Sequence, residues 1–326
     1  MSKILYLVIP CYNEEAVIMD TANKLKRKMN NLIQNQLIDG LSRIVFVNDG
    51  SMDLTWKKIT ELYESDNLFC GINLTRNRGH QNALLAGLLT VKDDADIVIS
   101  LDADLQDDID VFENMLEANE QGYDIVYGVR SDRKKDSRFK KNTAQAFYKL
   151  TNRLGGELVY NHADFRLMSK RAIEGLGQFT EVNLFLRGIV PLIGYPSTIV
   201  EYERKERLAG ETKYPLRKMI SFAVEGITSL SDKPMRMIIG LSGIVFLISI
   251  AMMIYALVSY FTGNVVPGWT SILISVWAIG ALVLFAIGIV GTYIGKIYLE
   301  TKNRPRYIVE EYLKHNTEHP AEERRL

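Results

Sequence analysis

Short apolar runs alternate with amphipathic stretches along the first 130 residues or so of the chain. The runs have the length and apolar character of buried strands, and the stretches between them repeat apolar residues at helical spacing. The pattern predicts strands at residues 4–9, 43–47, 71–74, 97–101 and 124–129, and helices at 14–32, 54–63 and 81–89. Such alternation is typical of an α/β fold with a mixed, mainly parallel sheet flanked by helices.

A long uncharged region follows much later, where residues 237–295 contain no Asp, Glu, Lys or Arg. One bilayer crossing takes about 20 apolar residues, and a Gly- and Pro-containing connection at 262–269 divides the region. We therefore predict two transmembrane helices, at about 237–261 and 272–294. Two buried helices of a large soluble core are the alternative.

Basic residues flank this region on both sides and are absent from its middle: Lys233 and Arg236 before it, and Lys296, Lys302, Arg304 and Arg306 after it. By the positive-inside rule, the start of the first predicted membrane helix and the end of the second are cytoplasmic, so the two form a hairpin. The N-terminal apolar run ends in acidic residues without a cleavage site, so it is not a signal peptide. We expect a multi-pass protein of the cell inner (plasma) membrane.

Four regions are expected on this basis. An α/β domain occupies residues 1–213, an interfacial amphipathic helix region 214–234, the two membrane helices 235–296, and a cytoplasmic tail 297–326. The apolar stripe at 216–230 is typical of a helix that lies in the headgroup plane. Packing of that helix against the α/β domain is the alternative.

Composition narrows the class of partner. The chain has 39 basic and 39 acidic residues, and this neutral balance argues against a general nucleic-acid binder. Its two cysteines, Cys11 and Cys70, are expected to be reduced thiols in the cytoplasm. The segment 130–141 carries seven basic and two acidic residues, so it is either a solvated loop or a contact to anions or acidic lipid.

Polar residues follow each predicted strand, where ligands bind in open α/β sheets. They are Tyr12, Asn13 and Glu14, then Asp49, Arg76, Asp102 with Asp104, and Arg130. No Gly-x-Gly-x-x-Gly turn follows the first strand, and a Walker phosphate loop is missing too. The usual dinucleotide-dependent oxidoreductase is therefore disfavoured.

Asp102 and Asp104 lie two residues apart at the end of an apolar run. Residues so spaced on a strand share a face, so both carboxylates can turn toward one point. Mg²⁺ or Mn²⁺ is often held by such carboxylates together with substrate phosphates. A simple turn cap is the alternative. His162 is expected to pack or hydrogen-bond, because no second His lies at ligand spacing.

Five motifs together resemble the family 2 glycosyltransferases of GT-A fold. They are PCYNE from Pro10, VNDGS from Val47, LTRNRGHQ from Leu74, DADLQ from Asp102 and ADFR from Ala163. The hairpin and the tail GTYIGKIYLETKNRPRY resemble the bacterial undecaprenyl-phosphate glycosyltransferases, and the soluble part is similar to dolichol-phosphate mannosyltransferase.

The resemblance implies roles for individual residues. The donor nucleotide would be held by Pro10, Tyr12, Glu14, Val47, Asp49, Arg76 and Asp102, and the metal, Mg²⁺ or Mn²⁺, by Asp102, Asp104 and Gln106. Asp164 takes the position of the family's proposed catalytic base, and Arg204, Arg207 and Lys213 match its basic loop. Asn48 departs from the family, where many members carry Asp.

The resemblance also implies an activity. It is inverting transfer of glucose or an N-acetylhexosamine from a UDP-sugar to undecaprenyl phosphate, by a metal-dependent enzyme that acts at the bilayer as a homo-oligomer such as a tetramer. A GDP-mannose-using mannosyltransferase and a non-catalytic sugar-nucleotide-binding regulator are the alternatives. A processive polysaccharide synthase is disfavoured because no Gln-x-x-Arg-Trp segment is present. Since a phosphate monoester has a second pKa of about 6, Asp164 either acts as a base or positions the sugar or Arg166.

Overall fold

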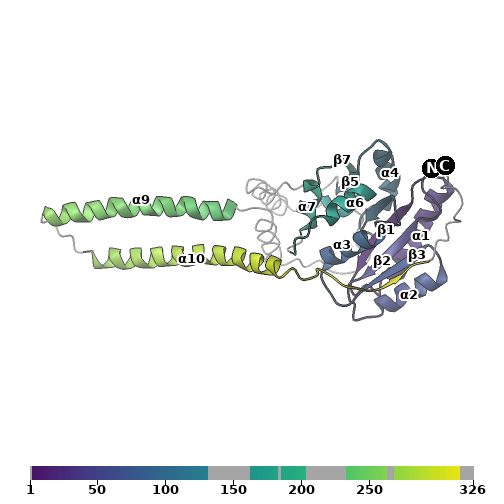
Figure 1. The fold of residues 1–326 in the computed structure, drawn as a ribbon, viewed down its shortest axis with the longest axis horizontal. Helices are drawn as coiled ribbons and strands as arrows, with labels where there is room; N and C mark the ends of the chain where they lie inside the picture. Colours follow the sequence, from purple (N-terminus) through teal and green to yellow (C-terminus); the bar gives the residue numbers. More distant parts are fainter. Residues whose placement is uncertain (1, 131–161, 183–184, 203–232, 263–267, 316–326) are drawn as a thin grey trace. The chain divides into compact units, whose positions relative to one another are not determined.

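The computed structural model describes residues 2–130, 162–182, 185–202, 233–262 and 268–315 (Figure 1). The chain divides into two compact units, each of which is described by itself. The first comprises Met1–Tyr148, Glu157–Tyr214 and Pro305–Leu326, and the second comprises Lys149–Gly156 and Pro215–Arg304. The first unit therefore contains chain segments from both before and after the second.

In the described residues of the first unit, an eight-stranded sheet has the order β7-β5-β6-β4-β1-β2-β3-β8. Pairing is parallel throughout except along β6 and β8, which run opposite to their neighbours. The strands are β1 (Leu5–Cys11), β2 (Arg43–Asn48), β3 (Phe69–Leu74), β4 (Ile97–Ser100), β5 (Ile125–Arg130), β6 (His162–Ser169), β7 (Ser197–Tyr202) and β8 (Val309–Leu313).

Helices cover both faces of this sheet and bury two apolar layers. One face carries α1 (Ile18–Gln34), α2 (Thr55–Ser65) and α4 (Phe112–Glu120), the last preceded by the short helix η1 (Ile109–Val111); the other carries α3 (His80–Val91), α6 (Lys170–Gly177) and α7 (Leu186–Leu192). In α1 the buried apolar residues recur every three or four positions, which turns one stripe toward the sheet.

The fold class, the five expected strands and the three expected helices are confirmed. The pattern did not predict β6, β7 or β8. Strand β6 contains the polar residues around Asp164. Its residues alternate between the two apolar layers, with Phe165 and Leu167 in one and Met168 in the other. Strand β8 lies within the expected tail, so that part of the chain belongs to the sheet.

The second unit contains two long helices, α9 (Lys233–Phe261) and α10 (Trp269–Thr301), which contact each other and lie side by side in Figure 1. Within the described residues, Ala278–Thr301 alone is long and apolar enough to span a membrane, by length and composition, with a hydropathy of 2.1. The apolar part Met237–Met252 of α9 is shorter. The two expected membrane helices lie within α9 and α10.

Three expectations fall outside the described residues: the interfacial helix predicted from the apolar stripe at 216–230, the basic segment after Arg130, and the loop that carries Arg204, Arg207 and Lys213. The limits drawn for the four regions stay predictions.

Candidate functional site

The loops that follow β1 and β2 are joined to each other at the carboxyl edge of the sheet. The Asp49 N–H donates to the Cys11 carbonyl over 2.9 Å. The Asn13 N–H donates to Ser51 Oγ over 3.0 Å, and the Met52 N–H returns a bond of 2.9 Å to Asn13 Oδ1. Asn13 has a left-handed backbone, with a φ of 54°.

The residues predicted to hold the nucleotide surround this junction. Pro10 and Val47 are buried register partners in β1 and β2. Tyr12 lies beside the junction with 44% of its surface exposed, available to a planar ligand. The Glu14 N–H donates to Thr55 Oγ1 over 2.9 Å, which ties the loop after β1 to the start of α2.

Asp49 is buried and organises the loop after β3. Its Oδ1 accepts the Arg78 N–H over 2.7 Å and its Oδ2 accepts the Gly79 N–H over 2.9 Å. Burial raises the pKa of this carboxyl, and the two backbone donors oppose that rise. Gly50 has a φ of 62°, and a Cβ there would stand 2.5 Å from the Arg76 carbonyl carbon. The loop that carries Arg76 is therefore held against the β2 loop.

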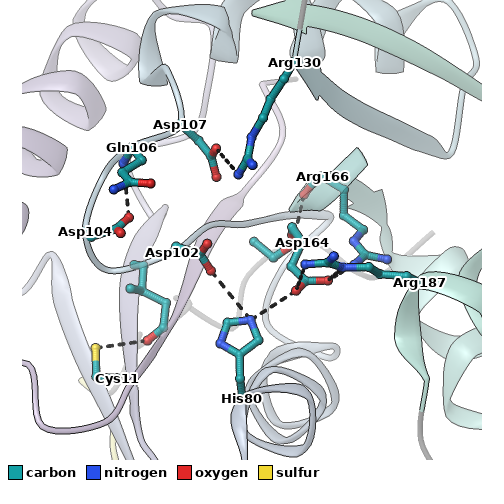
Figure 2. A network of polar contacts seen from close by, with 12 residues as sticks. Cys11, His80, Asp102, Asp104, Gln106, Asp107, Arg130, Asp164, Arg166 and Arg187 are labelled. Atoms are coloured by element: carbon teal, nitrogen blue, oxygen red, sulfur yellow. Dashed lines mark hydrogen bonds and ion pairs between the residues drawn. The ribbon is translucent and has the colours of Figure 1, made fainter. Parts of the chain in front are cut away.

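Asp102 and Asp104 follow β4 on a turn in which Leu105 has a φ of 45°. Both carboxylates are partly exposed, whereas Gln106 is buried. Asp104 Oδ1 accepts the Gln106 N–H over 3.2 Å, a turn contact that Asp102 does not make (Figure 2). The turn cap therefore has a contact at Asp104, and the assignment of both carboxylates to a metal stays a prediction.

The donor set at this turn fits a divalent cation. The pKa of Asp102 is raised to about 6, mainly by burial and also by the carboxylates of Asp107, Asp164 and Asp104, while His80 opposes the rise. Carboxylates repel one another around Asp102, and a divalent cation bound there would relieve that repulsion. Among the described residues, no three His, Cys, Asp or Glu side chains converge into a complete ligand set.

Asp164 is the buried centre of an ionic cluster on the α3 side of β6 (Figure 2). Its Oδ1 accepts from Arg166 Nη2 over 2.7 Å, and its Oδ2 accepts from Arg187 Nη2 over 3.1 Å. His80 Nε2 lies 3.3 Å from Oδ2 of the same carboxylate and 3.6 Å from Asp102 Oδ1. The cluster therefore reaches the DADLQ turn through His80.

The charge state of Asp164 follows from these partners. Burial by itself raises its pKa, but the hydrogen bond from His80 and the charges of Arg187 and Arg166 lower the pKa well below its usual value. Asp164 is a carboxylate at neutral pH. A weakly basic group of this kind transfers a proton poorly near pH 7.

Two members of this cluster were missed from sequence. His80 belongs to the motif LTRNRGHQ but was given no role, and Arg187 lies in a stretch without a motif. Arg187 reaches Asp164 because the N–H of its neighbour Leu186 donates to Gln81 Oε1 over 2.7 Å, which ties α7 to the start of α3. No spacing signal could have shown this contact, which joins residues more than a hundred positions apart.

Arg130, the residue expected at the end of β5, belongs to a second buried cluster. Its Nη2 donates to Asp107 Oδ1 over 3.3 Å and its Nε to Tyr202 Oη over 3.2 Å. The Tyr202 hydroxyl also donates to Asp107. Arg204, Arg207 and Lys213 lie outside the described residues, so their roles stay predictions.

Comparisons with known proteins agree with the motifs. Residues 6–177 match the sequence model of the family described as Glycosyl transferase family 2. The uncharacterized glycosyltransferase YkoT of Bacillus subtilis is 49% identical over 94% of this chain and 91% of its own. The SfII prophage-derived bactoprenol glucosyl transferase of Shigella flexneri is 42% identical over 93% of this chain and 96% of its own.

Solved structures with similar folds are more distant. Mannosyl-3-phosphoglycerate synthase of Rubrobacter xylanophilus is 18% identical, with a TM-score of 0.46 over 68% of this chain and 71% of that one. Glucosyl-3-phosphoglycerate synthase of Mycobacterium tuberculosis, in complex with Mn²⁺, UDP and glucosyl-3-phosphoglycerate, is 18% identical, with a TM-score of 0.42 over 70% and 78% of the two chains.

Proposed function

The chain belongs to glycosyl transferase family 2, and we propose that it transfers a sugar from a UDP-sugar to undecaprenyl phosphate at the cytoplasmic face of the membrane. One observation carries the proposal: relatives named bactoprenol glucosyl transferases align with 93% of this chain, through both the sheet and the helical unit. Their names favour glucose over an N-acetylhexosamine as the sugar.

The reaction is a displacement at the anomeric carbon of the sugar. An oxygen of the acceptor phosphate forms the new bond to that carbon, and the bond from the carbon to the β-phosphate oxygen breaks. The electron pair leaves with UDP, and attack from the opposite face inverts the centre. The acceptor phosphate, with a second pKa of about 6, is already mostly ionised at pH 7.

We propose that Asp102, Asp104 and Gln106 hold Mg²⁺ or Mn²⁺ next to the donor diphosphate. A divalent cation there supplies neutralisation of the charge that grows on the leaving group. The raised pKa of Asp102 and the crowding of carboxylates around it support this assignment. Arg204, Arg207 and Lys213 are proposed to approach the same diphosphate.

We propose that Asp164 is an anchor for neighbouring cations and takes no proton from the acceptor. Its low pKa and its contacts to Arg166, Arg187 and His80 support this role. In this account the carboxylate holds Arg187 in the cluster and keeps His80 beside Asp102.

The order of the chain supports a hairpin that crosses the membrane twice. Strand β8 follows α10 and pairs with β3 in the sheet that precedes α9. Both ends of the helical unit are thereby tied to one folded unit, so a crossing by α10 needs a return crossing by α9. The basic residues at both ends support a cytoplasmic location for that side, by the positive-inside rule.

The experiment uses full-length protein in detergent with undecaprenyl phosphate, Mn²⁺ and one of UDP-glucose, UDP-N-acetylglucosamine or GDP-mannose. Mass analysis of the lipid identifies the product. We expect a hexosylated lipid from UDP-glucose. A product from GDP-mannose alone would establish the mannosyltransferase alternative, and nucleotide binding without any lipid product would establish a non-catalytic binder.

A further inference from the structure

The C-terminal strand β8 is an edge strand of the sheet in the first unit. It pairs antiparallel with β3, and the Thr75 N–H donates to the Ile308 carbonyl over 3.2 Å just before the strand. Beyond it, Lys314 pairs with Asp94, and His315 stacks on Tyr63 with 4.1 Å between ring centroids. The chain therefore enters the sheet within a few residues of the end of α10.

A line of side-chain hydrogen bonds runs from this strand into the β2 loop. Asn73 Nδ2 donates to Glu310 Oε2 over 2.9 Å, and Asn48 Nδ2 donates to Asn73 Oδ1 over 2.7 Å. The Ser51 N–H then donates to Asn48 Oδ1 over 3.2 Å. Glu310, Asn73 and Asn48 form what we name the amide relay.

The direction of the amide relay is set at its exposed end. An ionised carboxylate only accepts hydrogen bonds, so Glu310 requires the NH₂ group of Asn73 to face it. The Asn73 oxygen then faces Asn48, which must present its own NH₂ group. The Asn48 oxygen is thereby left to the Ser51 N–H. Asn48 is 3% exposed, so a mispaired amide there costs a buried hydrogen bond.

The far end of the relay meets the predicted nucleotide site. Ser51 also accepts the Asn13 N–H through its hydroxyl, and Asn13 adjoins the exposed ring of Tyr12. Three strands thus contribute to one hydrogen-bonded line at the carboxyl edge, where such sheets bind ligands.

We propose that the amide relay lets the C-terminal strand position the loops that bind the nucleoside diphosphate, with Glu310, Asn73 and Asn48 as positioning residues. The inference rests on the proposed function for the identity of the ligand. It makes the segment after α10 a part of the donor site, and it gives Asn48, the departure from the family pattern, a defined partner.

The test reverses the polarity of the relay and then restores it. In Asn48→Asp the side chain no longer donates, so Asn73 must turn its NH₂ group inward and its oxygen toward the Glu310 carboxylate. In the double variant with Glu310→Gln, the glutamine NH₂ group faces that oxygen. Glu311→Gln, one position along β8, is the matched control because its side chain makes no described polar contact.

We expect Asn48→Asp to weaken UDP binding in the presence of Mn²⁺ roughly tenfold in titration calorimetry of the full-length protein, the size of one lost hydrogen bond. The double variant should bind within about threefold of the wild type on the same grounds. Glu311→Gln should bind as the wild type does. In turnover, Asn48→Asp should raise the KM for the UDP-sugar and leave kcat and the KM for the lipid unchanged.

Equal UDP affinities of Asn48→Asp and the double variant would overturn the proposal, as would a kcat loss in place of the KM change. If the wild type binds no UDP, the proposed function fails instead. The relay is then decided in ligand-free protein by the melting temperature, which must fall in Asn48→Asp, where the Asn73 oxygen faces the Glu310 carboxylate, and recover in the double variant. Equal melting temperatures of the two variants would refute it.

Discussion

Nε2 of His80 lies 3.3 Å from Oδ2 of Asp164, and this contact joins the first residue of α3 to the reversed strand β6. The same nitrogen lies 3.6 Å from Oδ1 of Asp102, so one imidazole spans the buried cluster and the proposed metal turn (Figure 2). Side chains that orient a metal ligand in this way typically contribute 10- to 100-fold to metal affinity or activity.

His80→Ala is therefore expected to lower kcat/KM roughly 10- to 100-fold, because Asp102 loses the contact that fixes its Oδ1. Steady-state kinetics over a range of Mn²⁺ concentrations measures the effect, with the melting temperature as a check on folding. Wild-type kcat/KM at every Mn²⁺ concentration would show that His80 plays no part in the site.

Replacement of Asp164 separates an anchor from a base. Asp164→Asn leaves the buried Arg166 guanidinium without its counter-charge, which typically costs about 3–5 kcal/mol of stability. Adding Arg166→Gln removes the stranded charge, so the double variant should regain much of that stability and measurable turnover. Thermal unfolding and lipid-product assays report both. A stable Asp164→Asn protein that has lost turnover completely would support the base role.

Acid should weaken the fold through Asp124. Its Oδ1 accepts from Arg171 Nε over 2.5 Å and from Ser169 Oγ over 2.7 Å, and Arg171 above all lowers its pKa in the folded protein. A lowered folded-state pKa gives stability that is present above the unfolded value of about 3.9 and lost as the pH falls below it.

Asp124→Asn should therefore lower the melting temperature at pH 7, and the difference from the wild type should shrink as the pH falls below about 4. Thermal unfolding at a series of pH values in one buffer system measures it. A difference that stays constant down to acid pH would contradict the ion pair as its source.

Membrane sidedness can be tested by thiol labelling, because Cys11 and Cys70 are both buried. Gly268→Cys places a thiol just before α10, and Thr301→Cys places one at the end of that helix. In intact cells an impermeant maleimide should label the first and spare the second until the membrane is opened. Labelling of both, or of neither, in intact cells would contradict the hairpin.

The part of the fold set by local pattern could be predicted from the sequence. Strands such as β1 and β4 are mainly apolar runs, which indicates burial on both faces of the sheet. Helix α1 has one apolar stripe, which indicates burial on one side. Strand β6 carries Asp164 and Arg166 inward. Because these inward residues are charged, the strand lacks the alternation of apolar and polar residues that marks a half-buried strand. Their burial is explained by tertiary partners such as Arg187 and His80.

The same distinction holds for the site. Residues on the strand-end turns, such as Asp102 and Asp104, could be identified because parallel strands bring their carboxyl ends to one edge. Glu310 on β8 contacts Asn73, and Arg187 on α7 contacts Asp164. Both contacts depend on tertiary packing, which local spacing in the sequence does not reveal.

The most direct test is a coupled measurement on full-length wild type and Asp104→Asn with UDP-glucose, undecaprenyl phosphate and Mn²⁺. Asp110→Asn is the matched control, an exposed carboxylate on the same connection. The account predicts one glucosylated lipid formed for each UDP released by the wild type and the control, and neither product from Asp104→Asn or after chelation of the metal. UDP release without lipid product, or full transfer by Asp104→Asn, would contradict it.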